Sequence, residues 1–176
     1  MNLRFDVIVV GSGHAGIEAA LAASRLGLKT ANITLRLDRI GHLPCNCSIG
    51  GPAKGHMVRE IDALGGQMAV TAVLATTHTR RVGTGRGPAV QTVRAHVCKN
   101  TYPKLMRTVV EAQPNLTLLE GLVESLLWTP VGVRGVNAVL AQGPVEIESR
   151  AVVLTTGTFL NGLCHEGMNA GQAARE

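Results

Sequence analysis

Aromatic side chains are nearly absent from this sequence, at 2% of 176 residues. That scarcity argues against a nucleic-acid module that stacks bases on aromatic rings. Charged residues are also few, at 16%, whereas 45% of the residues are hydrophobic. Disordered chains have the opposite balance, so we expect one folded domain with a buried core.

Long apolar runs are lacking as well. None approaches the ~18 residues that a membrane-spanning helix requires, and the run Val7–Val10 is too short for the core of a signal peptide. Only four cysteines are present, and no second close pair accompanies Cys45 and Cys47. We therefore predict reduced thiols, no metal site, no membrane association and a cytoplasmic location.

Glycine, by contrast, is abundant, with 21 residues. Residues 5–10 predict a buried parallel strand, residues 14–26 a helix with an alanine-rich face, and residues 30–35 a second strand. Between the first strand and the helix, the sequence fits G-x-G-x-x-G, which brings a dinucleotide pyrophosphate to the positive end of a helix. We therefore predict that a dinucleotide is bound by Gly11, Ser12, Gly13, His14, Ala15 and Gly16.

The acidic residue that would hold the ribose hydroxyls is not where this pattern expects it. The second strand leads into Arg36, and Asp38 comes two places late. Arg36 either accommodates a 2′-phosphate, which would favour NADP, or is an ordinary solvated charge at the end of a strand.

The middle of the chain is basic and rich in glycine. The net charge is +5, and four arginines gather here: Arg80, Arg81, Arg86 and Arg94. We interpret residues 80–88 as a loop that either contacts the phosphate groups of a ligand or is simply solvated. Helical spacing predicts helices over residues 57–68, interrupted by two glycines, and over residues 94–112, with a kink or a boundary at Pro103.

The last third of the chain changes to the period of strands. Short strands are predicted at residues 116–119, 123–128, 133–141, 145–149 and 151–154. An antiparallel meander that returns to a strand followed by a Thr-Gly turn is typical of flavoproteins with two dinucleotide-binding halves. We therefore predict an α/β fold, a Rossmann-like FAD-binding domain of that type with a parallel sheet and a small antiparallel β-meander crossover. Thr156 and Gly157 are predicted to contact the cofactor.

Five segments along nearly the whole chain resemble one family, the glucose-inhibited division protein A flavoproteins, which modify the wobble uridine of tRNA. The segments are DVIVVGSGHAGIEAALAA from Asp6, LDRIGHLPCNCSIGGPAKGHMVREIDALGG from Leu37, RGPAVQTVRA from Arg86, QPNLTLLEGLVESL from Gln113 and AVVLTTGTFLNG from Ala151. The resemblance implies that residues 1–176 are the N-terminal portion of the family's FAD-binding domain.

The resemblance also implies two further site residues. Cys45 matches a cysteine implicated in catalysis, although Pro44, Asn46 and Cys47 depart from the family's Ser-Cys-Asn-Pro loop. Cys45 either acts as a thiolate nucleophile or is a small buried apolar residue. Val123 matches a residue whose backbone contacts the flavin cofactor in the family.

Cofactors and partners follow from the resemblance too. It implies FAD, NADH as the reductant, methylenetetrahydrofolate as the one-carbon donor, tRNA as the substrate, and the tRNA-modification GTPase as a partner, with a homodimer left open. The implied reaction adds a carboxymethylaminomethyl group at C5 of the wobble uridine. We do not recognise the family's NADH-binding and tRNA-binding regions in this chain. Two alternatives therefore stay open: a truncated non-catalytic flavin-fold fragment, and a small FAD- or NADP-dependent oxidoreductase unrelated to tRNA.

Overall fold

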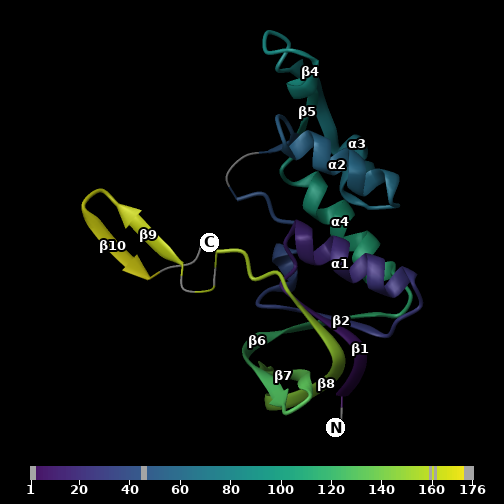
Figure 1. Ribbon diagram of the computed structural model, residues 1–176, viewed down its shortest axis with the longest axis vertical. Helices are drawn as coiled ribbons and strands as arrows, with labels where there is room; N and C mark the ends of the chain where they lie inside the picture. Colours follow the sequence, from purple (N-terminus) through teal and green to yellow (C-terminus); the bar gives the residue numbers. More distant parts are fainter. Residues whose placement is uncertain (1–2, 45–46, 159, 161, 173–176) are drawn as a thin grey trace.

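The computed structural model describes residues 3–44, 47–158, 160 and 162–172. A strongly curved sheet lies at one end of the molecule, α1 and α4 lie beside it, and a smaller sheet projects at the far end (Figure 1). The curved sheet closes on itself in the order β1 (Leu3–Val10), β2 (Thr30–Thr34), β6 (Leu116–Thr129), β7 (Gly132–Leu140) and β8 (Gly143–Leu154). The helices are α1 (His14–Arg25), α2 (Lys54–Ala63), α3 (Met68–Ala75) and α4 (Thr101–Ala112), with short 3-10 turns η1 (Leu37–Arg39) and η2 (Pro88–Val90).

Strand β1 lies between two parallel neighbours, as its apolar sequence predicts. Ile8 and Val9 are fully buried, which is typical of a strand covered on both faces. In the parallel pairs with β2 and β8, Val10 is level with Ile33 and with Leu154. The carboxyl ends of these three strands therefore meet at one edge of the sheet, and the predicted Rossmann-like α/β fold is confirmed.

The predicted antiparallel meander is also confirmed, but with fewer and longer strands. β7 pairs antiparallel with both β6 and β8. Strand β6 runs through two predicted strands and changes its partner from β2 to β7 at Gly121. Gly121 does not end the strand. A Cβ built there would lie 2.6 Å from the Val139 carbonyl oxygen, so the glycine allows close pairing instead of a turn. β8 likewise joins the last two predicted strands.

The smaller sheet corrects two predictions for the middle of the chain. Its order is β3 (Ser48–Gly50), β5 (Thr92–Val97) and β4 (Thr76–Val82), all antiparallel. Arg80 and Arg81 therefore lie on a strand, and the predicted loop is confined to the turn that follows β4. Residues 77–81 of β4 are all exposed, so this strand lacks the apolar alternation on which strand prediction depends.

The helix predicted from residue 94 begins later than expected. Arg94 lies on β5, and α4 starts at Thr101. Pro103 is in the first turn of α4, where a backbone N–H has no intrahelical acceptor, so it causes no kink. The alternative of a boundary near Pro103 agrees with the start of α4 two residues before it. The two-glycine interruption is confirmed, because α2 ends at Ala63 and α3 begins at Met68.

Two hydrophobic cores hold these layers together. The core between the helices includes Ile17 and Leu21 of α1 and Tyr102, Met106 and Val110 of α4. The core of the curved sheet includes Phe5, Ile8, Ile33, Val136 and Ile147. A separate antiparallel hairpin of β9 (Leu163–Glu166) and β10 (Asn169–Gln172) lies away from the rest (Figure 1).

A carboxylate on α1 fixes the start of α3. Glu18 accepts hydrogen bonds from the backbone N–H groups of Gln67, at 3.0 Å, and Met68, at 2.6 Å. The first N–H groups of a helix have no intrahelical acceptor, and the helix dipole favours a negative charge beside them. Glu18 therefore links α1, the helix that follows the G-x-G-x-x-G motif, to the start of α3.

Candidate functional site

The candidate site lies where β1 turns into α1. The N–H of Gly11 donates to the Ile33 carbonyl across 2.7 Å, and Gly11 has φ = +101°, a conformation that favours glycine. The N–H of Ile17 then donates to the Gly13 carbonyl at 2.9 Å. The N–H groups of residues 14–16 precede this bond in the helix, so they remain for a ligand at the positive end of the helix.

Two of the three glycines in the G-x-G-x-x-G motif, Gly11 and Gly16, have no room for a side chain because other atoms of the turn and Thr155 lie too close. A Cβ built at Gly11 would lie 2.5 Å from the Thr155 carbonyl oxygen, and one at Gly16 would overlap the Gly11 carbonyl oxygen. Thr155 follows β8 and donates its hydroxyl hydrogen to the Val10 carbonyl at 2.7 Å. The turn is thus closed against the last strand of the curved sheet.

Gly13 differs from both neighbours, because it faces open space. Among the described residues, no heavy atom outside its chain neighbours lies within 4 Å of a Cβ built there. Gly13 is exposed, has φ = −71°, and directly precedes α1. Its backbone conformation therefore tolerates a side chain, whereas an anion approaching the helix start would meet that side chain. This is the arrangement expected of the second glycine of a dinucleotide site.

A buried polar lock supports the turn from inside the sheet. Asn32 of β2 is fully buried and donates its amide hydrogens to the Val9 carbonyl, at 3.1 Å, and to the Gly11 carbonyl, at 2.9 Å. Its side-chain oxygen accepts the hydroxyl hydrogen of Ser12 at 2.7 Å. Ser12 is therefore a buried support of the turn, and its hydroxyl does not face an approaching ligand.

His14 and Tyr102 form a pair behind the start of α1. Their ring centroids are 5.6 Å apart. Burial, assisted by the positive charge of Lys54, lowers the pKa of His14 to about 4, so the ring is neutral near pH 7. Burial also raises the pKa of Tyr102. His14 Nε2 and the Tyr102 hydroxyl are buried without a hydrogen-bond partner among the described residues, so each is a polar group that a bound molecule or water would satisfy.

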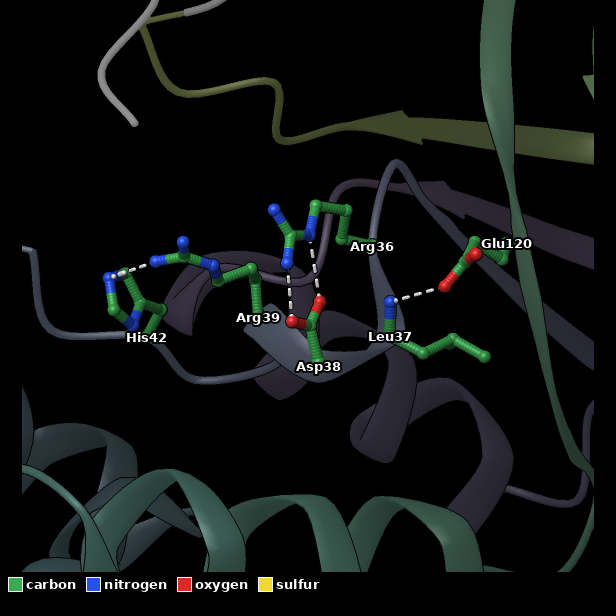
Figure 2. Close-up of polar contacts among 6 residues, drawn as sticks. All are labelled: Arg36, Leu37, Asp38, Arg39, His42 and Glu120. Atoms are coloured by element: carbon green, nitrogen blue, oxygen red, sulfur yellow. Dashed lines mark hydrogen bonds and ion pairs between the residues drawn. The ribbon is translucent and has the colours of Figure 1, made fainter.

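The turn after β2 is closed by its own polar contacts (Figure 2). Arg36 pairs with Asp38 through two contacts, Nε to Oδ1 at 2.9 Å and the second guanidinium nitrogen to Oδ2 at 2.6 Å. Glu120 of β6 accepts the N–H of Leu37 at 2.8 Å. The Arg36 charge is thus balanced by a carboxylate and both side chains are exposed, which favours the strand-end interpretation of Arg36 over a site for a 2′-phosphate.

The structure places the other predicted site residues as follows. Val123 is half-buried on β6, three residues beyond Glu120, which is level with Thr34 at the end of β2. Thr156 and Gly157 follow Thr155 immediately, with Gly157 exposed. Cys45 lies outside the described residues.

Cys47, the second cysteine of the same loop, is half-buried. Its Sγ lies 3.7 Å from His96 Nδ1. Its neighbour in the fold is therefore a residue of β5 and not of the fingerprint turn.

Sequence reasoning missed Asn32, Thr155 and Tyr102. The signal for Asn32 was an amide in a strand that is otherwise apolar. For Thr155, it was the first hydroxyl after the strand that pairs with β1. Tyr102 gave no signal, because a single tyrosine in an amphipathic helix is ordinarily a core residue.

The comparisons with known proteins agree on one family. The family model described as glucose inhibited division protein A matches residues 6–176. The chain belongs to this family. The tRNA uridine 5-carboxymethylaminomethyl modification enzyme MnmG of Bacillus licheniformis is 51% identical over 159 residues, covering 90% of this chain and 25% of that protein. MnmG of Bdellovibrio bacteriovorus is 48% identical, covering 95% and 26%. The chain thus spans about a quarter of the length of these family members.

Solved structures give the same result. GidA of Aquifex aeolicus superposes with a TM-score of 0.86 at 46% identity, covering 95% of this chain and 27% of that one. The GidA-related protein of Thermus thermophilus, with a TM-score of 0.64 at 18% identity, shares the fold. In the part of the chain that the structure describes, no helix is long and apolar enough to cross a membrane.

Proposed function

We propose that this chain is the FAD-binding part of an enzyme that adds a carboxymethylaminomethyl group at C5 of the tRNA wobble uridine. Membership of the family and the activity named for its MnmG relatives support the reaction. The observation that supports the cofactor is Gly13, which is open to solvent between two glycines whose missing side chains are needed for packing.

In this proposal the FAD pyrophosphate lies against the backbone N–H groups at the start of α1. The helix dipole and unused N–H groups favour an anion there. The absence of a side chain at Gly13 lets the phosphates come close. The neutral imidazole of His14, with its buried Nε2 unsatisfied among the described residues, fits a polar ligand group. Ala15 is exposed at the same helix end and offers its backbone.

The rest of the cofactor would follow the carboxyl edge of the sheet. Val123 would contact it through its backbone, and Thr156 and Gly157 would contact it just beyond β8. The pair of Arg36 with Asp38 leaves no unbalanced charge for a 2′-phosphate, which is why we propose FAD in preference to NADP.

Bound FAD would supply two-electron transfer, with NADH as the reductant. The residues of this chain would bind and orient it, and we propose Cys45 as the nucleophile on the strength of its match to a cysteine implicated in the family's catalysis. Residues 1–176 would form the N-terminal portion of the FAD-binding domain, acting in the cytoplasm. The partners proposed are tRNA, the tRNA-modification GTPase and a second copy of the chain, all on the strength of family membership.

Titration of the purified chain with FAD, followed by visible absorbance and flavin fluorescence, tests the cofactor. We expect saturable binding and release of FAD on denaturation. Gly13→Ala should weaken FAD binding by about tenfold or more while leaving the thermal unfolding midpoint unchanged. Gly85→Ala is the matched control, because Gly85 is also open among the described residues but lies in the turn after β4. A chain that does not take up FAD, or a Gly13→Ala variant that binds like wild type, would overturn this proposal.

The reaction has a separate test. The chain is incubated with unmodified tRNA, NADH, methylenetetrahydrofolate, an amine source and the GTPase, and the nucleosides are then measured by mass spectrometry. Modified uridine that disappears in Cys45→Ser supports the proposed role. FAD binding without modified uridine would identify a flavin-binding fragment instead.

A further inference from the structure

The net positive charge of this protein comes from one segment. Residues 63–110 contain seven lysine and arginine residues and no aspartate or glutamate. Since the whole chain has 17 basic and 12 acidic residues, the remainder has ten basic and twelve acidic ones. The excess of +5 therefore comes entirely from this segment, which includes β4, β5 and α4.

The fold gathers part of this charge on the small sheet that projects from the molecule (Figure 1). Arg80 of β4 is directly opposite Arg94 of β5 in the antiparallel register, whereas Arg81 is opposite Val93, so Arg80 and Arg81 point to opposite faces of the sheet. Like charges directly opposite each other, as at Arg80 and Arg94, destabilise a sheet.

Four exposed arginines of α2, β4 and the turn after β4 lack carboxylate partners among the described residues. Among the described residues, ion pairs are formed by Arg36, Arg107, Arg134 and Arg150. Within the same part of the chain, none is formed by four exposed arginines, which we call the basic surface: Arg59, Arg80, Arg81 and Arg86. Their charges are therefore available to a ligand.

A hollow lies within this surface. It has a volume of about 300 Å³ and is lined by Arg59 of α2 and Arg81 of β4, together with Pro88, Gln91 and Thr92. Two guanidinium groups thus reach one hollow from different elements, and no acidic side chain of the described residues lines it. Guanidinium forks match phosphate oxygens in geometry, so paired arginines of this kind are suited to a phosphate group.

We propose that the basic surface binds the phosphate backbone of RNA, with one phosphate held between Arg59 and Arg81. RNA follows from the proposed function, on which this inference rests, because the substrate proposed there is tRNA. Charges distributed over α2, both faces of β4 and the following turn fit a polymer of phosphates better than one small anion. The scarcity of aromatic residues means that contact is with the backbone and not by base stacking.

The test is tRNA binding by the FAD-loaded chain, measured by filter binding over a range of salt concentrations. Arg59→Gln with Arg81→Gln should weaken binding by about tenfold at low salt and reduce the slope of log K against log salt by ~0.7–0.9 for each phosphate that the variant no longer neutralises. The control is Arg134→Gln with Arg150→Gln, which removes the same charge from arginines already paired with carboxylates. The control should bind tRNA nearly as well as wild type.

Three results would overturn the inference: no tRNA binding by the wild-type chain, wild-type binding by the Arg59/Arg81 variant, or equal weakening of both double variants. Equal displacement of tRNA by polyglutamate would do the same, since it would indicate a site for any polyanion. FAD affinity measured on the same samples separates this inference from the proposed function. Loss of FAD binding in wild type counts against the flavin proposal alone, whereas intact FAD binding with unaltered tRNA binding in the variant rejects the basic surface.

Discussion

Ser12 donates its hydroxyl hydrogen to Asn32 across 2.7 Å inside the sheet, so the turn after β1 is held by β2 and not only by its own glycines. The same amide satisfies the Val9 and Gly11 carbonyls. One buried side chain thus fixes the shape of the loop against which we propose that the pyrophosphate lies.

We expect Asn32→Ala to lower the free energy of unfolding by about 3 kcal/mol, because it leaves several buried polar groups without partners. Urea denaturation measures the change. Ser12→Ala is the control, since it removes one hydroxyl and leaves the two amide donors in place, and it should cost about 1 kcal/mol. An Asn32→Ala variant as stable as Ser12→Ala would show that the two amide hydrogen bonds of Asn32 do not stabilise the turn.

Gly16→Ala should prevent normal folding of the turn. Its Cβ would overlap the Gly11 carbonyl oxygen and lie 2.7 Å from Thr155 Oγ1, and this backbone is fixed by the sheet. We expect a loss of several kcal/mol in unfolding free energy, of the size seen for severe overpacking. Thermal unfolding of Gly16→Ala and Gly13→Ala side by side checks this. Equal midpoints for the two variants would show that the third glycine is not a packing requirement.

The stability of the protein should fall between pH 7 and pH 5 because of His14. Its pKa in the folded state is about 4, below the ordinary 6.5, so the unfolded chain binds more protons in this range. The stabilisation is present above pH 6.5 and is lost as the pH falls, by about 2 kcal/mol at pH 5. Urea midpoints for wild type and His14→Gln measure it, and the variant should show a flatter profile. The half-buried His42, replaced by Gln, should leave most of the dependence in place.

Glu18→Ala should loosen the start of α3. It removes the carboxylate that accepts the N–H groups of Gln67 and Met68, and losing a helix-capping group costs about 1 kcal/mol or more. Hydrogen exchange at these two amides should accelerate in Glu18→Ala. Glu60→Ala, on the exposed face of α2, is the control and should leave their exchange unchanged.

The sequence alone predicted the turn at G-x-G-x-x-G, because its glycines are needed for steric reasons that any chain with this turn shares. Gly11 and Gly16 are packed where the pattern predicts. The apolar run of β1 was equally readable, since both faces of the strand are buried. The meander was predicted in kind, while its strand boundaries were not, because Gly121 marks a close backbone approach and not a turn.

What could not be predicted depends on contacts between distant residues. Thr155 and Asn32 reach the turn from other strands, and nothing beside them in sequence marks that role. Arg94 was placed in a helix because β5 alternates weakly, and its strand state comes from pairing with β3 and β4. Tertiary pairing overrides local preference in such short segments.

The bond from Thr155 to Val10 spans 145 residues, and this has a consequence for the order of events during synthesis. At about 5–20 residues per second, the ribosome delivers Thr155 roughly 7 to 30 s after Val10. α1 and β2 can form in that interval, whereas β1 waits with one edge unpaired and open to other strands. The cofactor turn is therefore completed only after β8 has been made, so loading is expected to wait for residue 155, and the waiting edge is the part that a chaperone would most usefully cover.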